Sequence, residues 1–128
     1  MVIRDHFIFL WYPMHEVIFM FNIKDEEIKK LYDTHLISKK PLKLKEFPTR
    51  EKRKFIILGM LVHLFEPGKI YKEKEVNEIL SQIHLDYAVL RRYLVDYKFM
   101  KREVDGSVYT LSVDPNEYTR FKIDLFLE

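Results

Sequence analysis

The sequence contains no cysteine and only three glycines. Without cysteine, the chain can form no disulfide, no cysteine nucleophile and no thiolate metal site. The glycines stand singly at positions 59, 68 and 106, so there is no glycine-rich loop of the kind that binds phosphate groups. Because a chain without disulfides suits a reducing compartment, we expect a cytoplasmic protein.

The chain also lacks an apolar run long enough to cross a membrane. Its most hydrophobic segment, residues 7–21, is interrupted by Pro13, His15 and Glu16, whereas a spanning helix needs about 20 apolar residues. We therefore expect no membrane partner. The segment has two interpretations: an ordered element that packs on the domain or on a second copy, or upstream sequence that precedes a natural start at Met20.

The spacing of the polar residues indicates neither a metal site nor a catalytic centre. The five histidines form no i,i+4 pair, and no paired carboxylates stand beside them at ligand spacing. No Ser-His-Asp arrangement can be argued from the spacing either. We expect a protein that is not an enzyme and that has no metal and no cofactor.

What the chain does have is an uneven distribution of charge. Residues 39–102 hold sixteen basic and eight acidic residues, a net charge of +8, whereas residues 1–38 and 103–128 have net charges of −2 and −4. The densest basic stretch is residues 39–54, with eight basic residues. Such a segment favours a polyanionic partner, although a charge run can also be only a solvated helix start and linker.

Periodicity and breaker residues predict helix, short strand, two helices and a hairpin in the basic part of the chain. Before them, a helix is expected over 24–36 and an extended connector up to Pro48. A two-residue hairpin turn is indicated by Asp105 and Gly106. In the tail, Asp114 and Pro115 favour a helix from about 115, although apolar alternation from Phe121 also fits a strand. In the basic part of the chain, helices are expected over 50–65, 73–83 and 86–97. A short strand is expected over 69–71 and the hairpin over 100–113.

This order of elements is typical of an α+β, mainly helical fold with a winged helix-turn-helix core and extra terminal elements. In such a core the third helix, 86–97, enters the major groove of DNA and the 100–113 hairpin, or wing, lies over the flanking backbone. We expect an N-terminal extension over 1–41, a winged-helix domain over 42–113 and a C-terminal tail over 114–128. The apolar ends predict a homodimer.

Four stretches resemble one known family: LKEFPTREKRKFIIL, FEPGKIYKEKEVNEIL, DYAVLRRYLVDY and MKREVDGSVYTL. Over about residues 42–111 the chain is similar to a prokaryotic winged-helix-like domain family of unknown function, commonly labelled as transcriptional regulators. The resemblance implies a winged helix and a regulatory role, and the family's occurrence behind other helix-turn-helix domains also suits sensing or dimerisation. Lys72 stands where the family usually has threonine, so we expect a weaker capping box with Glu75.

The third helix has an outer face that suits DNA. At 100° per residue, Leu90 and Leu94 point to the core, while the outer face carries an arginine pair and two small apolar residues. Arginine pairs bidentately with guanine, and a small apolar side chain can contact a thymine methyl group. The residues of this predicted face are Ala88, Arg91, Arg92 and Val95.

Two other roles for the arginines remain open: Arg92 can pair with Asp96 at i,i+4, and Arg91 can fold onto the acidic start of the preceding helix, at Glu73 or Glu75. Further basic residues are predicted as backbone anchors. These are Lys52, Arg53, Lys54, Lys98, Lys101 and Arg102.

The acids Glu103 and Asp105 at the hairpin tip oppose entry of the wing into an electronegative minor groove. We expect a small DNA-binding transcriptional regulator that binds double-stranded DNA. The alternative is a winged-helix protein-interaction or dimerisation module that does not bind DNA.

Overall fold

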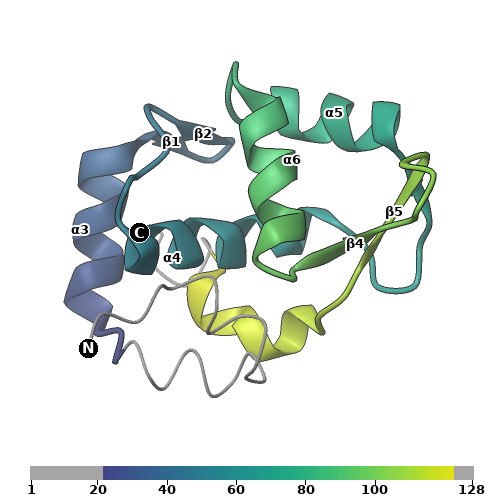
Figure 1. Ribbon diagram of the computed structural model, residues 1–128. Coiled ribbons are helices and arrows are strands. Elements are labelled where there is room, and N and C mark those ends of the chain that lie inside the picture. The colour runs from purple at the N-terminus through teal and green to yellow at the C-terminus, as the bar shows by residue number, and fades with distance from the viewer. Residues whose placement is uncertain (1–21, 123–128) are drawn as a thin grey trace, which may run out of the picture.

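The computed structural model of the protein describes residues 22–122 (Figure 1). The predictions for residues 7–21, and for the tail beyond residue 122, lie outside the described residues. The predicted α+β class is confirmed, with helices and two small antiparallel sheets. The elements in chain order are α3 (Asp25–His35), β1 (Leu36–Lys39), β2 (Leu42–Leu44), α4 (Glu51–Leu61), η1 (Val62–Leu64), β3 (Tyr71–Lys72), α5 (Glu73–Ser81), α6 (Tyr87–Asp96), β4 (Met100–Arg102), β5 (Val108–Leu111) and η2 (Pro115–Phe121).

Helix α4 is the centre of the core. Every residue from Phe55 to Leu61 is buried, as a helix that is apolar on all sides requires. In Figure 1 it lies in the middle of the molecule, with α3 on one side, η2 below it and α6 with the hairpin on the other side. The predicted central helix over 50–65 is therefore confirmed, except that its last turn, η1, is a 3-10 helix.

The three-stranded sheet has the order β3-β5-β4, and β5 pairs antiparallel with both neighbours. The predicted two-residue turn of the β4–β5 hairpin is wrong, because residues 104–107 form a wider loop. Glu103 N–H donates to the Val108 carbonyl at 3.0 Å, and Gly106, with φ of 75°, donates to the Glu103 carbonyl at 2.8 Å. The Asp105 carboxylate stabilises the loop by accepting from the Ser107 N–H and hydroxyl at 3.0 and 2.7 Å.

Helix α6 is capped at both ends. The Asp86 carboxylate accepts from the Val89 N–H at 3.4 Å. At the other end, Phe99 N–H donates to the Leu94 carbonyl at 2.9 Å and Lys98 N–H to the Val95 carbonyl at 3.1 Å. This is a Schellman motif, in which the left-handed position is usually glycine but here is Lys98, with φ of 65°.

The start of α5 has the incomplete cap that Lys72 predicts. The Glu75 carboxylate accepts from the Lys72 N–H at 3.0 Å, which is one half of a capping box. The other half needs an acceptor on the capping side chain, and a lysine ammonium has no lone pair to offer. The helix therefore begins with one cap bond fewer than threonine would provide.

The predicted extended connector over 38–48 is wrong in its first part. Residues 36–44 instead form the β1–β2 hairpin, which turns at Lys40 and Pro41. The expected boundary between the N-terminal extension and the winged-helix domain, after residue 41, falls at this turn. Leu36 and Leu44 are buried in the common core, and Leu44 N–H donates to the Ile83 carbonyl at 2.9 Å. Burial of these leucines and the bond to the α5–α6 turn stabilise a hairpin that has no Asn-Gly or Asp-Gly signal.

The tail begins as predicted. Asp114 caps η2 by accepting from the Asn116 N–H at 2.9 Å, and Pro115 occupies the first position. The segment is a 3-10 helix, and its Tyr118 and Phe121 are fully buried against α4. A methyl group on Gly59 would lie 2.5 Å from the Phe121 ring, so glycine at this position allows the tail to pack against α4.

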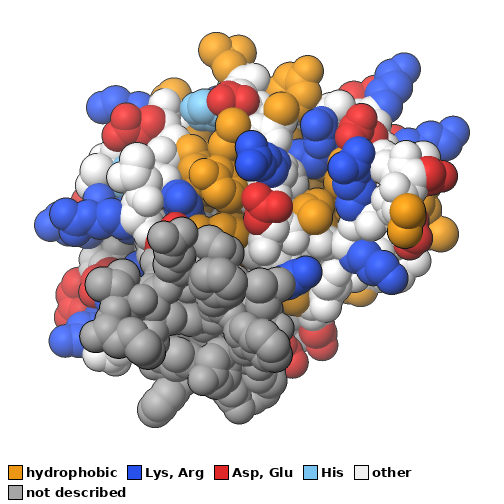
Figure 2. Space-filling model, in the orientation of Figure 1, with side chains coloured by type: hydrophobic (Ala, Val, Ile, Leu, Met, Phe, Trp, Pro, Cys, Tyr) orange, Lys and Arg blue, Asp and Glu red, His pale blue; other side chains and the backbone are white. Residues whose placement is uncertain are grey.

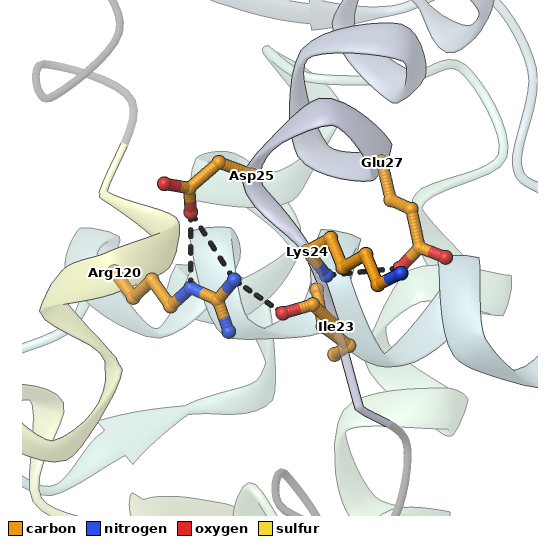
Figure 3. A network of polar contacts seen from close by, with 5 residues as sticks. All are labelled: Ile23, Lys24, Asp25, Glu27 and Arg120. Carbon is orange, nitrogen blue, oxygen red and sulfur yellow. Dashed lines mark hydrogen bonds and ion pairs between the residues drawn. The ribbon is translucent and has the colours of Figure 1, made fainter.

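Polar contacts join the tail to the beginning of α3. Figure 3 shows the Arg120 guanidinium donating to the Asp25 carboxylate, at 3.1 Å from Nη2 and 3.4 Å from Nε, and to the Ile23 carbonyl. Ile28 and Leu31 of α3 belong to the same hydrophobic core as α4 and η2. Within residues 22–122, the segments before and after the basic middle are thus packed into one core.

Candidate nucleic-acid interface

An open groove of about 500 Å³ lies between α6 and the β4–β5 hairpin. It brings together five of the ten predicted site residues. Figure 2 shows Lys and Arg side chains over the part of this face where α6 and the hairpin lie, with acidic side chains between them. The groove is lined by Ala88, Arg91, Arg92, Val95 and Arg102, together with Val89, Tyr109 and the acids Glu73 and Asp96.

Of the two adjacent arginines on α6, Arg92 is the more exposed. Its side chain is 80% exposed, and its Nε lies 3.6 Å from the Asp96 carboxylate, one helical turn further on. An exposed i,i+4 pair contributes only a few tenths of a kcal/mol, so a ligand can displace it. Ala88, one turn earlier on the same side, is also exposed and leaves space beside the guanidinium.

Arg91 is held against α5 instead. Its side chain is 22% exposed, its Nε lies 3.6 Å from the Glu73 carboxylate, and its Nη1 donates to the Asn77 side-chain oxygen. The same Glu73 oxygen accepts from the Tyr109 hydroxyl at 2.8 Å. Burial, and this bond to the carboxylate, raise the pKa of Tyr109. Of the alternatives open for Arg91, the contact with Glu73 is the one that forms.

A second hollow, of about 530 Å³, continues the face toward the start of α4. It shares Val95 and Asp96 with the groove and adds Lys54 and the exposed Lys98. The Lys54 ammonium lies 4.7 Å from the centre of the Tyr93 ring, a cation–π geometry, and 3.4 Å from the Glu51 carboxylate, so its charge is already paired in this hollow.

The predicted basic cluster Lys52–Lys54 is divided between two sides of α4. Lys52 Nζ lies 2.9 Å from the Glu27 carboxylate of α3, and Arg53 Nη1 lies 3.3 Å from His35 Nε2. Only Lys54 lines one of the two hollows. On β4, Arg102 faces the groove and Lys101 is exposed but is not among the groove residues, as alternation along a strand requires.

His35 is a buried ionisable group to which the sequence patterns assign no role. The Arg53 guanidinium donates to its Nε2, so the ring is bound in its neutral form with the proton on Nδ1, 3.9 Å from the Glu46 carboxylate. Burial, and then the charge of Arg53, lower the pKa of His35 below 6.5. A buried histidine between an arginine and a glutamate is hard to infer from spacing, since Arg53 comes from α4 and Glu46 from the β2–α4 connection.

Acidification should destabilise the fold through His35. Below its ordinary pKa of 6.5, the histidine of the unfolded chain binds a proton that the folded one does not, so stability falls as the pH is lowered. We expect the urea midpoint to decrease between pH 7.5 and pH 5.5. The variant His35→Gln should show a shallower pH dependence over this range. Equal slopes for the two proteins would contradict the assignment.

The described part of the chain offers no group of His, Asp or Glu side chains that could hold a metal ion. Within residues 22–122, none of the helices is long and apolar enough to cross a membrane.

The comparisons with known proteins give one match. No curated protein and no solved structure matches the chain. A family model described as "Uncharacterized protein conserved in bacteria (DUF2087)" matches residues 43–111, which include every residue that lines the groove between α6 and the hairpin. The resemblance to a bacterial family of unknown function is thereby confirmed, whereas the regulator label is no part of this description. Since the match covers more than half of its length, the chain belongs to this family of uncharacterized bacterial proteins.

Proposed function

We propose that the protein is a winged-helix domain that binds double-stranded DNA, with α6 in the major groove and the β4–β5 hairpin as the wing. The order α4, β3, α5, α6, β4, β5 and the sheet order β3-β5-β4 support this proposal. In a helix-turn-helix the second helix of the pair reads base edges while the first crosses the backbone. Helices α5 and α6 correspond to this pair.

The observation that carries the proposal is the position of Arg92. It is 80% exposed on the outer face of α6, beside Ala88 and within a groove that also contains Arg102. A guanidinium so placed can pair bidentately with guanine, and the neighbouring alanine can contact a thymine methyl group.

Lys98 supports a role for this face in binding phosphate. It occupies the left-handed position of the Schellman motif, where glycine would avoid the strain of a positive φ. A lysine there gives up helix-cap stability and places an exposed charge at the end of α6. Arg102 in the groove and the exposed Lys101 beside it on β4 are the further backbone anchors of this proposal. Lys54 is less available, because its side chain is 12% exposed and its ammonium lies 3.4 Å from the Glu51 carboxylate.

A protein-interaction or dimerisation module remains the second candidate. It is favoured by the bonds that hold Arg91 to Glu73 and Asn77, and by the acids at the hairpin tip. The predicted homodimer depends on the apolar termini. Because residues 1–21 lie outside the described residues, it stays a prediction, as do the regulatory role and the cytoplasmic location.

Fluorescence anisotropy tests the DNA proposal, with a duplex selected from a random library and with random duplex across a salt series. Wild type should bind both, with log K falling by about 0.9 per log unit of salt for each neutralised phosphate. Arg92→Ala should lose about 1–3 kcal/mol on the selected duplex and much less on random duplex.

Arg92→Lys is the matched control for charge. It keeps one positive charge but loses the planar fork that pairs bidentately, so it should keep the salt slope of wild type and still lose preference for the selected duplex. If wild type binds neither duplex at low salt, the DNA proposal fails. If Arg92→Ala weakens both duplexes equally, Arg92 is only a backbone anchor.

A further inference from the structure

We propose that Glu73 is a selectivity residue of the α6 groove, which limits binding to DNA of arbitrary sequence by neutralising Arg91. The inference rests on the proposed function, and it concerns how the same groove distinguishes one duplex from another. It assigns opposite roles to two adjacent arginines: Arg92 contacts the DNA, whereas Arg91 is paired with Glu73 and does not.

Glu73 is placed at a junction of three elements. As the first residue of α5, it donates its backbone N–H to the Ser107 carbonyl of the hairpin loop at 3.2 Å. Its carboxylate accepts from the Tyr109 hydroxyl of β5 at 2.8 Å and lies 3.6 Å from Arg91 Nε of α6. One carboxylate therefore faces both walls of the groove, the reading helix and the wing.

The charge of Glu73 matters more to a ligand than the charge of Asp96. The Arg91 side chain is 22% exposed, compared with 80% for Arg92, so solvent screens the Glu73–Arg91 pair less than the Arg92–Asp96 pair. The Asn77 side-chain oxygen accepts a further bond from Arg91 and fixes its guanidinium against α5. A phosphate approaching Arg91 meets a cation that already has a counter-charge and bound acceptors.

This arrangement weakens one kind of binding selectively. Binding to arbitrary sequence comes almost entirely from phosphate neutralisation, whereas a preferred site adds contacts to base edges. Specificity is the difference between these affinities, and repulsion of the wrong ligand increases it as effectively as attraction of the right one. A carboxylate beside Arg91 reduces the phosphate contribution and leaves the exposed Arg92 free to read bases.

The structural role of Glu73 can be separated from its charge by substitution. Glu73→Gln retains an oxygen that accepts from Tyr109 but removes the negative charge. Tyr109→Phe removes the hydroxyl that bonds Glu73 and leaves the charge. Glu78→Gln removes one negative charge at an exposed position of α5 that does not line the groove, which controls for net charge alone.

The experiment is anisotropy on the selected and the random duplex across a salt series, for wild type and these three variants. Glu73→Gln should bind random duplex about two- to fivefold more tightly, the scale of a surface charge pair. Its salt slope on random duplex should be steeper by about 0.9, because Arg91 neutralises one more phosphate. The ratio of selected to random affinity should fall. Glu78→Gln should keep the slope of wild type, and Tyr109→Phe should steepen it by less than Glu73→Gln does, because the carboxylate that neutralises Arg91 remains.

The outcomes separate the two proposals. If wild type binds DNA but Glu73→Gln has the slope and ratio of Glu78→Gln, the selectivity role is wrong and the DNA proposal stands. If Glu73→Gln weakens both duplexes in parallel with an unchanged slope, Glu73 is only a structural brace and the inference is again overturned. If wild type binds neither duplex, the proposed function itself fails, and the role of Glu73 fails with it.

Discussion

Replacing Phe55 with alanine should lower the free energy of unfolding by about 3–5 kcal/mol, the range for large aromatic truncations in a core. The Phe55 side chain is fully buried at the centre of α4. Its ring lies 5.4 Å from the ring of Phe99, 6.2 Å from Tyr118 and 6.0 Å from Phe121. Truncation therefore leaves a cavity where α4 meets the start of β4 and the tail, in addition to the lost transfer energy.

Urea unfolding followed by far-UV circular dichroism measures this loss. Tyr87→Ala is the matched control, since it truncates an aromatic residue that is 36% exposed on α6 and should produce a clearly smaller change. A loss of less than about 1.5 kcal/mol in the free energy of unfolding of Phe55→Ala would show that the tail does not pack on Phe55 as the ring contacts indicate.

Much of the middle of the fold is predictable because it depends on local patterns. The apolar run of α4, the breakers at residues 67–68 and the 3.6-residue period of α5 and α6 each determine an element without reference to the rest of the chain. The β1–β2 hairpin depends instead on burial of Leu36 and Leu44 against residues far along the chain. No pattern within residues 36–44 signals that burial.

In the candidate site, too, local patterns predict some features, and others depend on contacts between distant parts of the chain. Helical periodicity places Ala88, Arg92 and Val95 on one outer face, and the groove has them there. The division of the basic run also follows from periodicity, since Lys52 and Lys54 are 200° apart on a helix and cannot share a face. The bond between Glu73 and Tyr109 joins residues 36 positions apart, so only the folded chain reveals it.

Three substitutions on α6 should separate the contribution of the helix to stability from its proposed role in DNA binding, beginning with Leu94→Ala. Leu94 is fully buried, so its truncation should lower the free energy of unfolding by about 2–5 kcal/mol. Arg92→Ala should change it by less than about 0.5 kcal/mol, because an exposed i,i+4 pair contributes little. Arg91→Ala should fall between them, since it removes the donor to Asn77 and the counter-charge of the Glu73 carboxylate in a half-buried position.

DNA affinity, measured at a temperature where all three variants are folded, should follow a different order. Leu94→Ala should bind as wild type does, because its side chain points away from the groove, whereas Arg92→Ala should lose selected-site affinity while keeping its stability. Such opposite effects on stability and on binding would assign one face of α6 to the core and the other to the ligand. A loss of binding in Leu94→Ala with full binding in Arg92→Ala would contradict the assignment, because the groove would then need an intact core but not its exposed arginine.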